Sequence, residues 1–303
     1  PPPPSCPPAC ALPDLRPGYY EVPFGQTRCI PSNTILTTTL PFYIREGATL
    51  IICGQLNLNG DLYPAPNSSI YIAPGAELNV SGQMGLTSTG VTVHNYGTVT
   101  IGGSLFINAS TYFYNFGSGA SLQVREIGVN GGILGLYGAR VSVTGGNLWL
   151  NSGNICMRGG GCLSIQGSFS NSASKWNLVV GTEPVVFNFA GANAWLNQPL
   201  TNSSDLHACV APGSNVWGFW GNAQVHNNCT QGCGVLPYAL LSVSGRMEGA
   251  ERVYLQWELK GANIVPAKYR VYQRGTSGYA LVAETEQMWA YAPVLGEAPC
   301  FSE

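Results

Sequence analysis

The sequence predicts an all-β chain built around a right-handed parallel β-helix, a solenoid whose coils stack on one another. A five-residue pattern of apolar, polar, apolar, any residue and glycine recurs seven times, in steps of 22, 21, 23, 19, 22 and 24 residues. A fixed repeat of this length is typical of solenoids. Short alternating segments precede and follow the pattern in most repeats, as half-buried strands do. We therefore expect three strands per coil and seven to eight coils of about 22 residues each.

The repeated pattern predicts the core of the solenoid. Because alternate residues of a strand point to opposite faces, the first residue of each pattern should point inward and the second outward. Glycine ends every copy except one, where Glu126 takes its place. The predicted inward ladder consists of Leu56, Leu78, Val99, Leu122, Val141, Leu163 and Phe187. The predicted outward ladder beside it is neutral and consists of Asn57, Asn79, Thr100, Gln123, Ser142, Ser164 and Asn188.

Charged residues make up 9% of the chain, against about 25% in ordinary globular proteins. Stacked coils explain the deficit, because equivalent outward positions lie directly above one another and like charges at that spacing repel. Nine charged residues lie between residues 47 and 240, whereas 13 lie between 241 and 303. The net charge of −2 predicts no nucleic-acid surface. A hydrophobic content of 45% argues against disorder, and the sequence predicts no membrane span.

Composition divides the chain into five segments. Residues 1–13 are predicted to be a proline-rich extended arm, because proline cannot donate ladder hydrogen bonds. Residues 14–46 should lead into and cap the solenoid of residues 47–200. Residues 201–237 lose the repeat and contain three cysteines, which indicates a cysteine-rich cap or linker. Residues 238–303 alternate as strands of an Ig-like or fibronectin-like sandwich do, with Trp257 as its core tryptophan.

The predicted sandwich is shorter than such modules usually are. A complete one needs about seven strands in about 100 residues. We therefore expect its remaining strands to come from a neighbouring chain, or from sequence beyond residue 303.

The cysteines indicate the compartment. Ten cysteines in a chain with few charges predict disulfides and an oxidising, extracellular or cell-surface location. Spacing alone does not determine the pairing. The candidate disulfide cysteines are Cys6, Cys10, Cys29, Cys53, Cys156, Cys162, Cys209, Cys229, Cys233 and Cys300.

Two stretches carry a resemblance to a known group of proteins. Residues 75–82 read Gly-Ala-Glu-Leu-Asn-Val-Ser-Gly, and residues 253–274 contain Val-Tyr-Leu-Gln-Trp and Tyr-Arg-Val-Tyr-Gln-Arg. They resemble secreted bacterial cell-surface proteins in which a β-helix precedes a fibronectin type III or Ig-like module and a cleavable sorting domain. The resemblance covers residues 35–290 and rests on structural motifs. It implies an adhesin or a structural protein of the cell surface.

The sequence offers few groups for catalysis. Asp61 and Glu77 lie in one predicted coil, and paired carboxylates can cleave polysaccharides, but two solvated turn residues are the simpler interpretation. Arg125 and Glu126 predict a local ion pair. We predict no catalytic and no cofactor-binding residue.

One cluster resembles a metal site. Its spacing is similar to that of zinc ligands, but disulfides are the favoured interpretation in a chain with ten cysteines. We therefore predict no metal site for this cluster, which consists of His207, Cys209, His226, Cys229 and Cys233.

The predicted function is non-enzymatic. We expect an extracellular structural or adhesive protein that assembles into a surface filament, with copies joined head to tail through the chain ends and by strand complementation. Cys6 and Cys10 of the arm are predicted to reach a neighbouring copy. The alternative is a carbohydrate-binding or carbohydrate-active β-helix protein, similar to lyases or hydrolases, with surface glycans as partners. Its candidate sugar-facing residues, most of which fit core or ladder positions more simply, are Tyr112, Phe113, Tyr114, Phe116, Trp149, Trp217 and Trp220.

Overall fold

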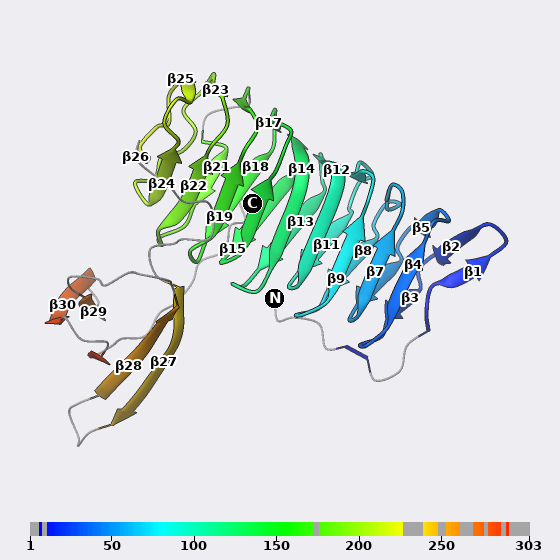
Figure 1. The fold of residues 1–303 in the computed structure, drawn as a ribbon, viewed down its shortest axis with the longest axis horizontal. Coiled ribbons are helices and arrows are strands. Elements are labelled where there is room, and N and C mark those ends of the chain that lie inside the picture. The colour runs from blue at the N-terminus through cyan, green and yellow to red at the C-terminus, as the bar shows by residue number, and fades with distance from the viewer. Residues whose placement is uncertain are drawn as a thin grey trace. The chain divides into compact units, whose positions relative to one another are not determined.

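The computed structural model describes residues 6–7, 11–172 and 176–226 in full, together with the backbone of five strands between residues 239 and 290. Contacts divide the chain into two compact units, residues 1–233 and 234–303. The first unit is a β-solenoid of stacked parallel strands (Figure 1), which confirms the predicted fold class. Among the described residues no helix is present, and so none is long and apolar enough to cross a membrane.

Strands from successive coils stack into three faces. The first face is an eight-stranded parallel sheet of β3 (Thr27–Ile30), β6 (Thr49–Ile52), β8 (Ser69–Ile72), β11 (Thr92–Asn95), β13 (Tyr112–Phe116), β15 (Ile133–Tyr137), β18 (Asn154–Arg158) and β21 (Leu178–Val180). The second face contains the repeated pattern and consists of β4 (Ile35–Thr38), β7 (Gln55–Leu58), β9 (Glu77–Val80), β12 (Thr98–Asn108), β14 (Ser121–Asn130), β16 (Arg140–Val143), β19 (Cys162–Ile165), β22 (Val185–Phe189), β24 (Leu206–Val210) and β26 (Gln224–His226).

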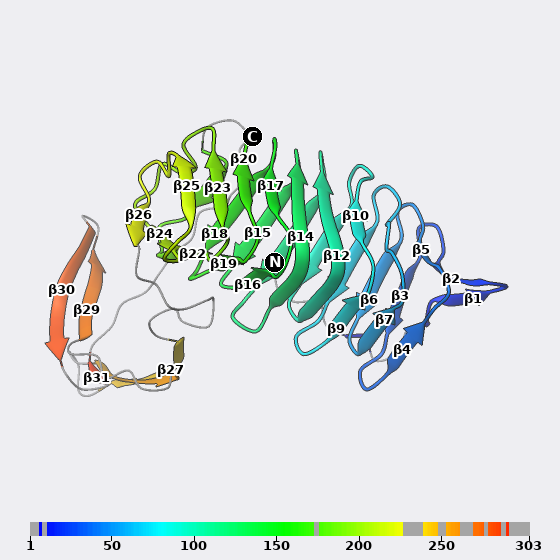
Figure 2. The ribbon, with the colours of Figure 1, turned by 45° about the horizontal axis from the view of Figure 1, so that its top comes forward.

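The third face shares two strands with the second. Strands β12 and β14 are long enough to continue around the corner between the two faces, with a register shift in their pairing between Ile101 and Ser104. Figure 2 shows the third-face strands side by side. They are the last parts of β12 and β14 together with β10 (Met84–Leu86), β17 (Leu148–Leu150), β20 (Phe169–Asn171), β23 (Asn193–Leu196) and β25 (Asn215–Gly218).

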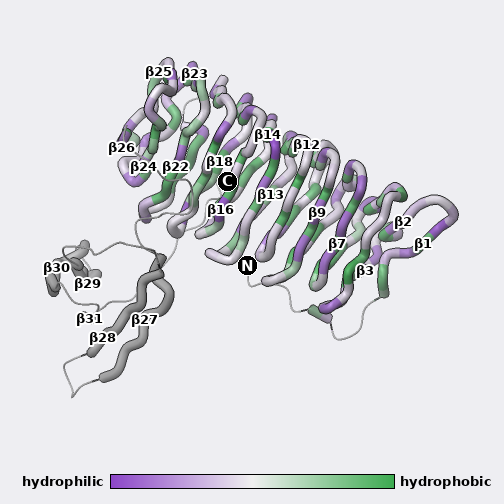
Figure 3. Tube along the Cα trace, viewed as in Figure 1, coloured by the Kyte–Doolittle hydropathy of each residue, from purple (hydrophilic) through white to green (hydrophobic). Residues whose placement is uncertain are grey.

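The predicted inward ladder is confirmed. Its seven residues pair in register from Leu56 to Phe187, and each is at most 1% exposed. Apolar and polar residues alternate along the strands (Figure 3), as the pattern requires. Burying an aliphatic side chain this completely stabilises a fold by about 1.5–3 kcal/mol. A second inward ladder lies two residues further along each strand and consists of Leu58, Val80, Ile101, Val124, Val143, Ile165 and Phe189.

Outward polar side chains bond from one coil to the next. The Asn79 amide donates to Asn57 Oδ1 at 2.9 Å, and the Asn57 amide donates to Thr37 Oγ1 at 2.9 Å. Near the other end of the ladder, the Asn188 amide donates to Ser164 Oγ at 3.1 Å. Neutral side chains therefore satisfy one another along the ladder, where stacked charges would repel.

The solenoid is longer than predicted. Strand β4 precedes the seven predicted repeats and β24 and β26 follow them, so ten strands pair along the second face and the solenoid has about ten turns. Residues 206–226, within the segment predicted as a cap or linker, carry coil strands. The pattern missed β4 and β26 because terminal coils bury less: Ile35 is 67% exposed, and β26 is exposed throughout. It missed β24, which does alternate and bury its inward residues, because Pro212 stands where the pattern has glycine.

Part of the segment predicted to lead into the solenoid forms a small sheet of its own, whereas its strands β3 and β4 already belong to the first and second faces. Strands β1 (Asp14–Arg16) and β2 (Tyr19–Val22) pair antiparallel, and β5 (Phe42–Ile44) pairs parallel to β2. Val22, Phe42 and Ile44 are buried in the solenoid core. Glu21 accepts from both Arg16 and Arg45, at 2.8 and 3.2 Å. Among the described residues, all ion pairs lie in this N-terminal region.

The second unit is described through the backbone of its strands. Strand β28 (Val253–Lys260) pairs antiparallel with β27 (Ala239–Met247) and with β31 (Trp289–Ala290), and β29 (Tyr269–Gly275) pairs antiparallel with β30 (Gly278–Thr285). Trp257 lies opposite Val243 in the pairing of β28 with β27. Its role as a sandwich core residue falls outside the described side chains and stays a prediction, as does the sandwich itself.

The glycine that ends the repeated pattern is required where two coils meet closely. A Cβ atom on Gly167 would lie 1.6 Å from the carbonyl oxygen of Gly146, whereas one on Gly145 would meet nothing nearer than Arg125 Cγ at 3.9 Å. Glu126 stands in the one copy without glycine, at the corner through which β14 continues, and its carboxylate accepts from Ser104 at 2.5 Å.

This difference predicts the effect of two alanine substitutions. Gly167→Ala should lower the free energy of unfolding by about 1–3 kcal/mol or more, because the coils must separate to admit the methyl group. Gly145→Ala, the matched control, should change it by less than about 0.5 kcal/mol. Denaturant titration followed by circular dichroism measures both. Equal effects of the two substitutions would contradict the close approach of the coils.

Candidate functional site

Exposed large hydrophobic side chains gather in the first and last turns of the solenoid. Between residues 64 and 175 of the described chain, no large hydrophobic side chain is classed as exposed. Those in the first turns are Leu12, Leu15, Phe24, Ile35, Leu40, Tyr43 and Tyr63. Those in the last turns are Trp176, Trp195, Trp217, Phe219 and Val225. Scattered apolar residues on a surface need no explanation, but clusters of this kind mark sites of interaction.

The last turns carry an aromatic pair beside a cavity. Trp195 on β23 and Trp217 on β25 occupy equivalent positions, and their rings stack with centroids 5.6 Å apart. They are 43% and 50% exposed. Trp220 turns inward and packs edge-on against Phe187, with ring centroids 5.5 Å apart. A cavity of about 420 Å³ opens here and is lined by Val210, Ala211, Pro212, Gly213, Ser214, Val216, Gly218, Trp220 and Val225.

The first turns present a different apolar surface. Phe24 is 72% exposed and Ile35 is 67% exposed. The Arg45 guanidinium lies 4.8 Å from the ring centroid of Tyr43, which is itself 40% exposed. This end therefore combines exposed hydrophobic side chains with an ion-pair network, whereas the other end offers stacked indoles and a cavity.

The histidines of the predicted zinc-like cluster do meet. His207 Nδ1 lies 3.2 Å from His226 Nε2, and the two rings stack with centroids 5.5 Å apart. Cys209 is disulfide-bonded and therefore has no thiolate to offer a metal. Among the described residues, no group of three or more potential ligands forms. Cys229 and Cys233 lie outside the described residues.

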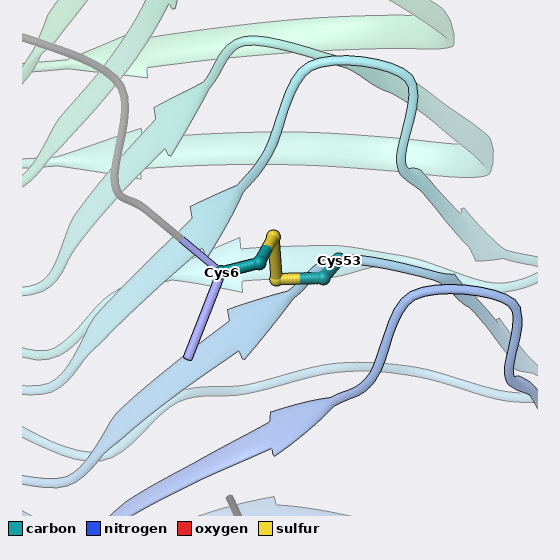
Figure 4. Close-up of a disulfide and its surroundings, with 2 residues drawn as sticks. All are labelled: Cys6 and Cys53. Atoms are coloured by element: carbon teal, nitrogen blue, oxygen red, sulfur yellow. A yellow bond between two sulfur atoms is a disulfide. The ribbon is translucent and has the colours of Figure 1, made fainter. Parts of the chain in front are cut away.

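Of the six candidate disulfide cysteines that the structure describes, five are disulfide-bonded. Cys6 is bonded to Cys53 across 47 residues of sequence (Figure 4). Cys29, Cys162 and Cys209 are also disulfide-bonded. The expectation that Cys6 reaches a neighbouring copy is wrong, because its sulfur is bonded within its own chain. Cys156 is buried, and the cysteines outside the described residues are Cys10, Cys229, Cys233 and Cys300.

The candidate carboxylates have structural partners. Asp61 Oδ1 accepts from the backbone N–H of Gln83 at 2.8 Å, which joins two neighbouring coils. Glu77 begins β9 with its side chain exposed. Glu126 accepts from Ser104 rather than pairing with Arg125, so the predicted ion pair is wrong: no ion pair joins these two residues in the described chain. These contacts favour turn and corner roles.

The first face carries a second aromatic cluster. Along it, Tyr71, His94 and Tyr114 occupy equivalent positions on β8, β11 and β13, and Phe116 pairs in register with Tyr137. Ring centroids lie 4.7 Å apart for Tyr71 and His94 and 5.1 Å apart for Phe116 and Tyr137. We call this cluster the aromatic strip and define it as Tyr71, His94, Tyr96, Tyr114, Phe116 and Tyr137.

The sequence analysis had identified only part of this strip. Tyr114 and Phe116 were candidate sugar-facing residues, whereas Tyr71, His94, Tyr96 and Tyr137 were missed. The signal was present, because aromatic residues recur at equivalent positions one coil apart. Of the other candidates, Phe113 and Trp220 pack in or against the core, Tyr112 and Trp149 are half-buried on β13 and β17, and Trp217 is exposed.

No protein-family model, no curated protein and no solved structure matches this chain. Its function is therefore inferred from its own surfaces. Three of them stand out: the two apolar ends and the aromatic strip.

His94 makes part of the strip sensitive to pH. Burial lowers the pKa of its imidazole from the ordinary value of 6.5. The unfolded chain therefore binds more protons than the folded chain once the pH falls below about 6.5. The free energy of unfolding should decrease as the pH is lowered through that range. Above this range His94 is neutral in both states and contributes no slope.

A substitution isolates this effect. His94→Gln should flatten the dependence of the denaturation midpoint on pH between about 7.5 and 5.5. Tyr71→Phe, which alters the ring stacked on His94 but keeps the imidazole, should retain the slope. Denaturant titrations at a series of pH values provide the measurement. An unchanged slope in His94→Gln would show that the imidazole is not desolvated in the folded chain.

Proposed function

We propose that this chain is an extracellular structural protein of the cell surface, whose copies join head to tail into a filament through the two ends of the solenoid. The C-terminal unit, in this proposal, is an Ig-like or fibronectin-like module that a neighbouring chain completes with a strand. Adhesion follows from display of the filament at the surface. No chemical step is part of this function.

The observation that carries the proposal is the position of the exposed hydrophobic side chains. They flank a stretch between residues 64 and 175 whose large hydrophobic side chains are covered. The strand edges of each coil can pair with a further coil, so the fold itself does not limit the number of coils. Apolar surface at both ends, and strands β25 and β26 at the edge of the described sheet, therefore favour contact with a second copy.

The composition and the disulfides support the location. Five of the six cysteines within the described residues are disulfide-bonded, and such bonds persist in oxidising compartments. The neutral ladders leave the sides of the solenoid with few charges, so side-to-side electrostatic attraction between copies is weak. Head-to-tail contacts that do not close into a ring produce open fibres.

A second candidate function is carbohydrate binding at the Trp195–Trp217 pair. Stacked, half-exposed indoles can pack against the apolar face of a sugar ring. This function uses one end of the solenoid and gives no role to the exposed residues of the first turns, which is why the filament is preferred. A glycan-binding screen with the monomeric protein distinguishes the two functions, since sugar binding does not require assembly.

Substitutions at the end of the solenoid test the filament. Trp217→Ser and Phe219→Ser each remove an exposed aromatic side chain, and aromatic anchors in interfaces contribute about 2 kcal/mol or more, equivalent to a roughly 30-fold change in affinity. We expect both variants to assemble at much higher concentrations than the natural sequence. Negative-stain electron microscopy and light scattering over a concentration series measure the assembly.

The matched control lies on the same face. Trp149→Ser removes an indole from β17, which precedes β23 and β25 along the third face. This variant should assemble as the natural sequence does, because Trp149 lies away from the ends. If the natural sequence stays monomeric at high concentration, or if Trp149→Ser impairs assembly as much as Trp217→Ser, the proposed end-to-end contact is wrong.

A further inference from the structure

The aromatic strip is an outward surface that is nevertheless covered. Its side chains project from the first face, away from the core, yet Tyr96 is only 8% exposed. The others are half-buried. Trp195 and Trp217, which also project outward as a stacked pair, are 43% and 50% exposed. The pair lies in the last turns, whereas the rings of the strip lie on interior coils with a neighbouring coil on each side.

A buried polar atom makes the same point. His94 Nδ1 is buried and has no hydrogen-bond partner. A buried polar atom without a hydrogen bond costs free energy in lost hydration. The imidazole is therefore shielded from water without gaining a hydrogen bond at Nδ1, which is the environment that a cover without hydrogen-bond donors provides.

The Cys6–Cys53 disulfide holds a suitable segment at the edge of the strip. Cys53 directly follows β6, and its backbone N–H donates to the last residue of the strand on the preceding coil, as do those of Ala73 and Tyr96. These three residues therefore occupy one column along the first face, which Phe116 and Tyr137 continue. The disulfide thus tethers Cys6 at the start of the column that contains half of the strip.

The chain approaches the strip in the right direction. Ala11 accepts from the backbone N–H of Cys29 on β3, which is one coil before β6. Going from Ala11 back to Cys6, the chain moves from the coil of Cys29 to that of Cys53. Beyond the coil of Cys53, the next coils in this direction are those of Ala73, Tyr96 and Phe116, in that order.

The five residues before Cys6 have a length and a chemistry that match the aromatic strip. The five residues before Cys6 are four prolines and a serine. In a polyproline II helix they extend about 15 Å, at 3.1 Å per residue. Coils repeat about every 4.8 Å, so this segment spans about three coils. Proline lacks a backbone N–H, and polyproline II segments bind aromatic surfaces at low entropic cost.

We propose that the aromatic strip is a polyproline-binding surface and that residues 1–5 of the same chain occupy it as a strap, which the Cys6–Cys53 disulfide holds in place. The strap covers Tyr96 and His94 and desolvates the imidazole. This inference is independent of the filament, since it concerns the side of the solenoid rather than its ends.

The test replaces the prolines and leaves the tether intact. In the full chain, residues Pro1 to Pro4 are changed to Gly-Ser-Gly-Ser while Cys6 and Cys53 are kept. The His94 pKa, measured by NMR titration, should rise toward its ordinary value. A synthetic Pro-Pro-Pro-Pro-Ser peptide should bind this variant at least about tenfold more tightly than the natural sequence, whose strip is already occupied.

Two further measurements keep the test decisive. Adding His94→Gln and Phe116→Ala to the strapless variant should abolish peptide binding, whereas adding Trp149→Ser on the third face should not. A photo-crosslinker in place of Pro3 should react with the strip of the same molecule. An unchanged His94 pKa without peptide binding, equal peptide binding by the natural sequence, or crosslinks to another molecule would each overturn the proposal.

Discussion

The structure depends on the stacking of one coil directly on the next at about 4.8 Å. At this spacing each side chain contacts the side chain at the equivalent position of the next coil. A residue must therefore pack well against its equivalents as well as against its other neighbours. Leu56 stacks on Leu78, and the Asn79 amide bonds to Asn57. Glycine 167 lies where the carbonyl of Gly146 leaves no room for a Cβ atom. Apolar ladders inside, neutral amides outside and glycine at close corners all follow from this single contact, and so does the scarcity of charge.

Because each coil is covered by its neighbours, the two ends of the solenoid remain partly uncovered. An interior coil covers its neighbours on both sides, whereas a terminal coil has a neighbour on one side. The exposed Phe24 and Ile35 at one end and Trp217 and Phe219 at the other follow directly. Natural solenoids either cap such ends with polar elements or use them for pairing. The ion pairs of Glu21 with Arg16 and Arg45 give the first end some polar character, and yet its apolar side chains remain exposed.

The repeating part of the fold could be predicted from the sequence because strand alternation and coil length act locally. The inward ladder from Leu56 to Phe187 was predicted residue by residue. The terminal strands β4 and β26 could not be predicted, since exposed coils do not need alternation, whereas β24 alternates but lacks the closing glycine of the pattern. The Cys6–Cys53 disulfide joins residues far apart in sequence, and spacing does not determine such a pair. The complete strip could not be predicted because coil lengths vary. Equivalent positions on neighbouring coils can be aligned only once the strand pairing is known.

The two aromatic clusters show how position along the solenoid decides what stacked rings can do. Trp195 and Trp217 lie in the last turns, where the outer indole has no further coil above it in the described third face. The strip spans consecutive interior coils, so its rings cover one another along the axis and leave their outer edges to a ligand that runs across coils. A ligand of that kind must be extended and must not compete for ladder hydrogen bonds. Proline-rich backbone has both properties, and a residue tethered at Cys53 brings it to the first coil of the strip.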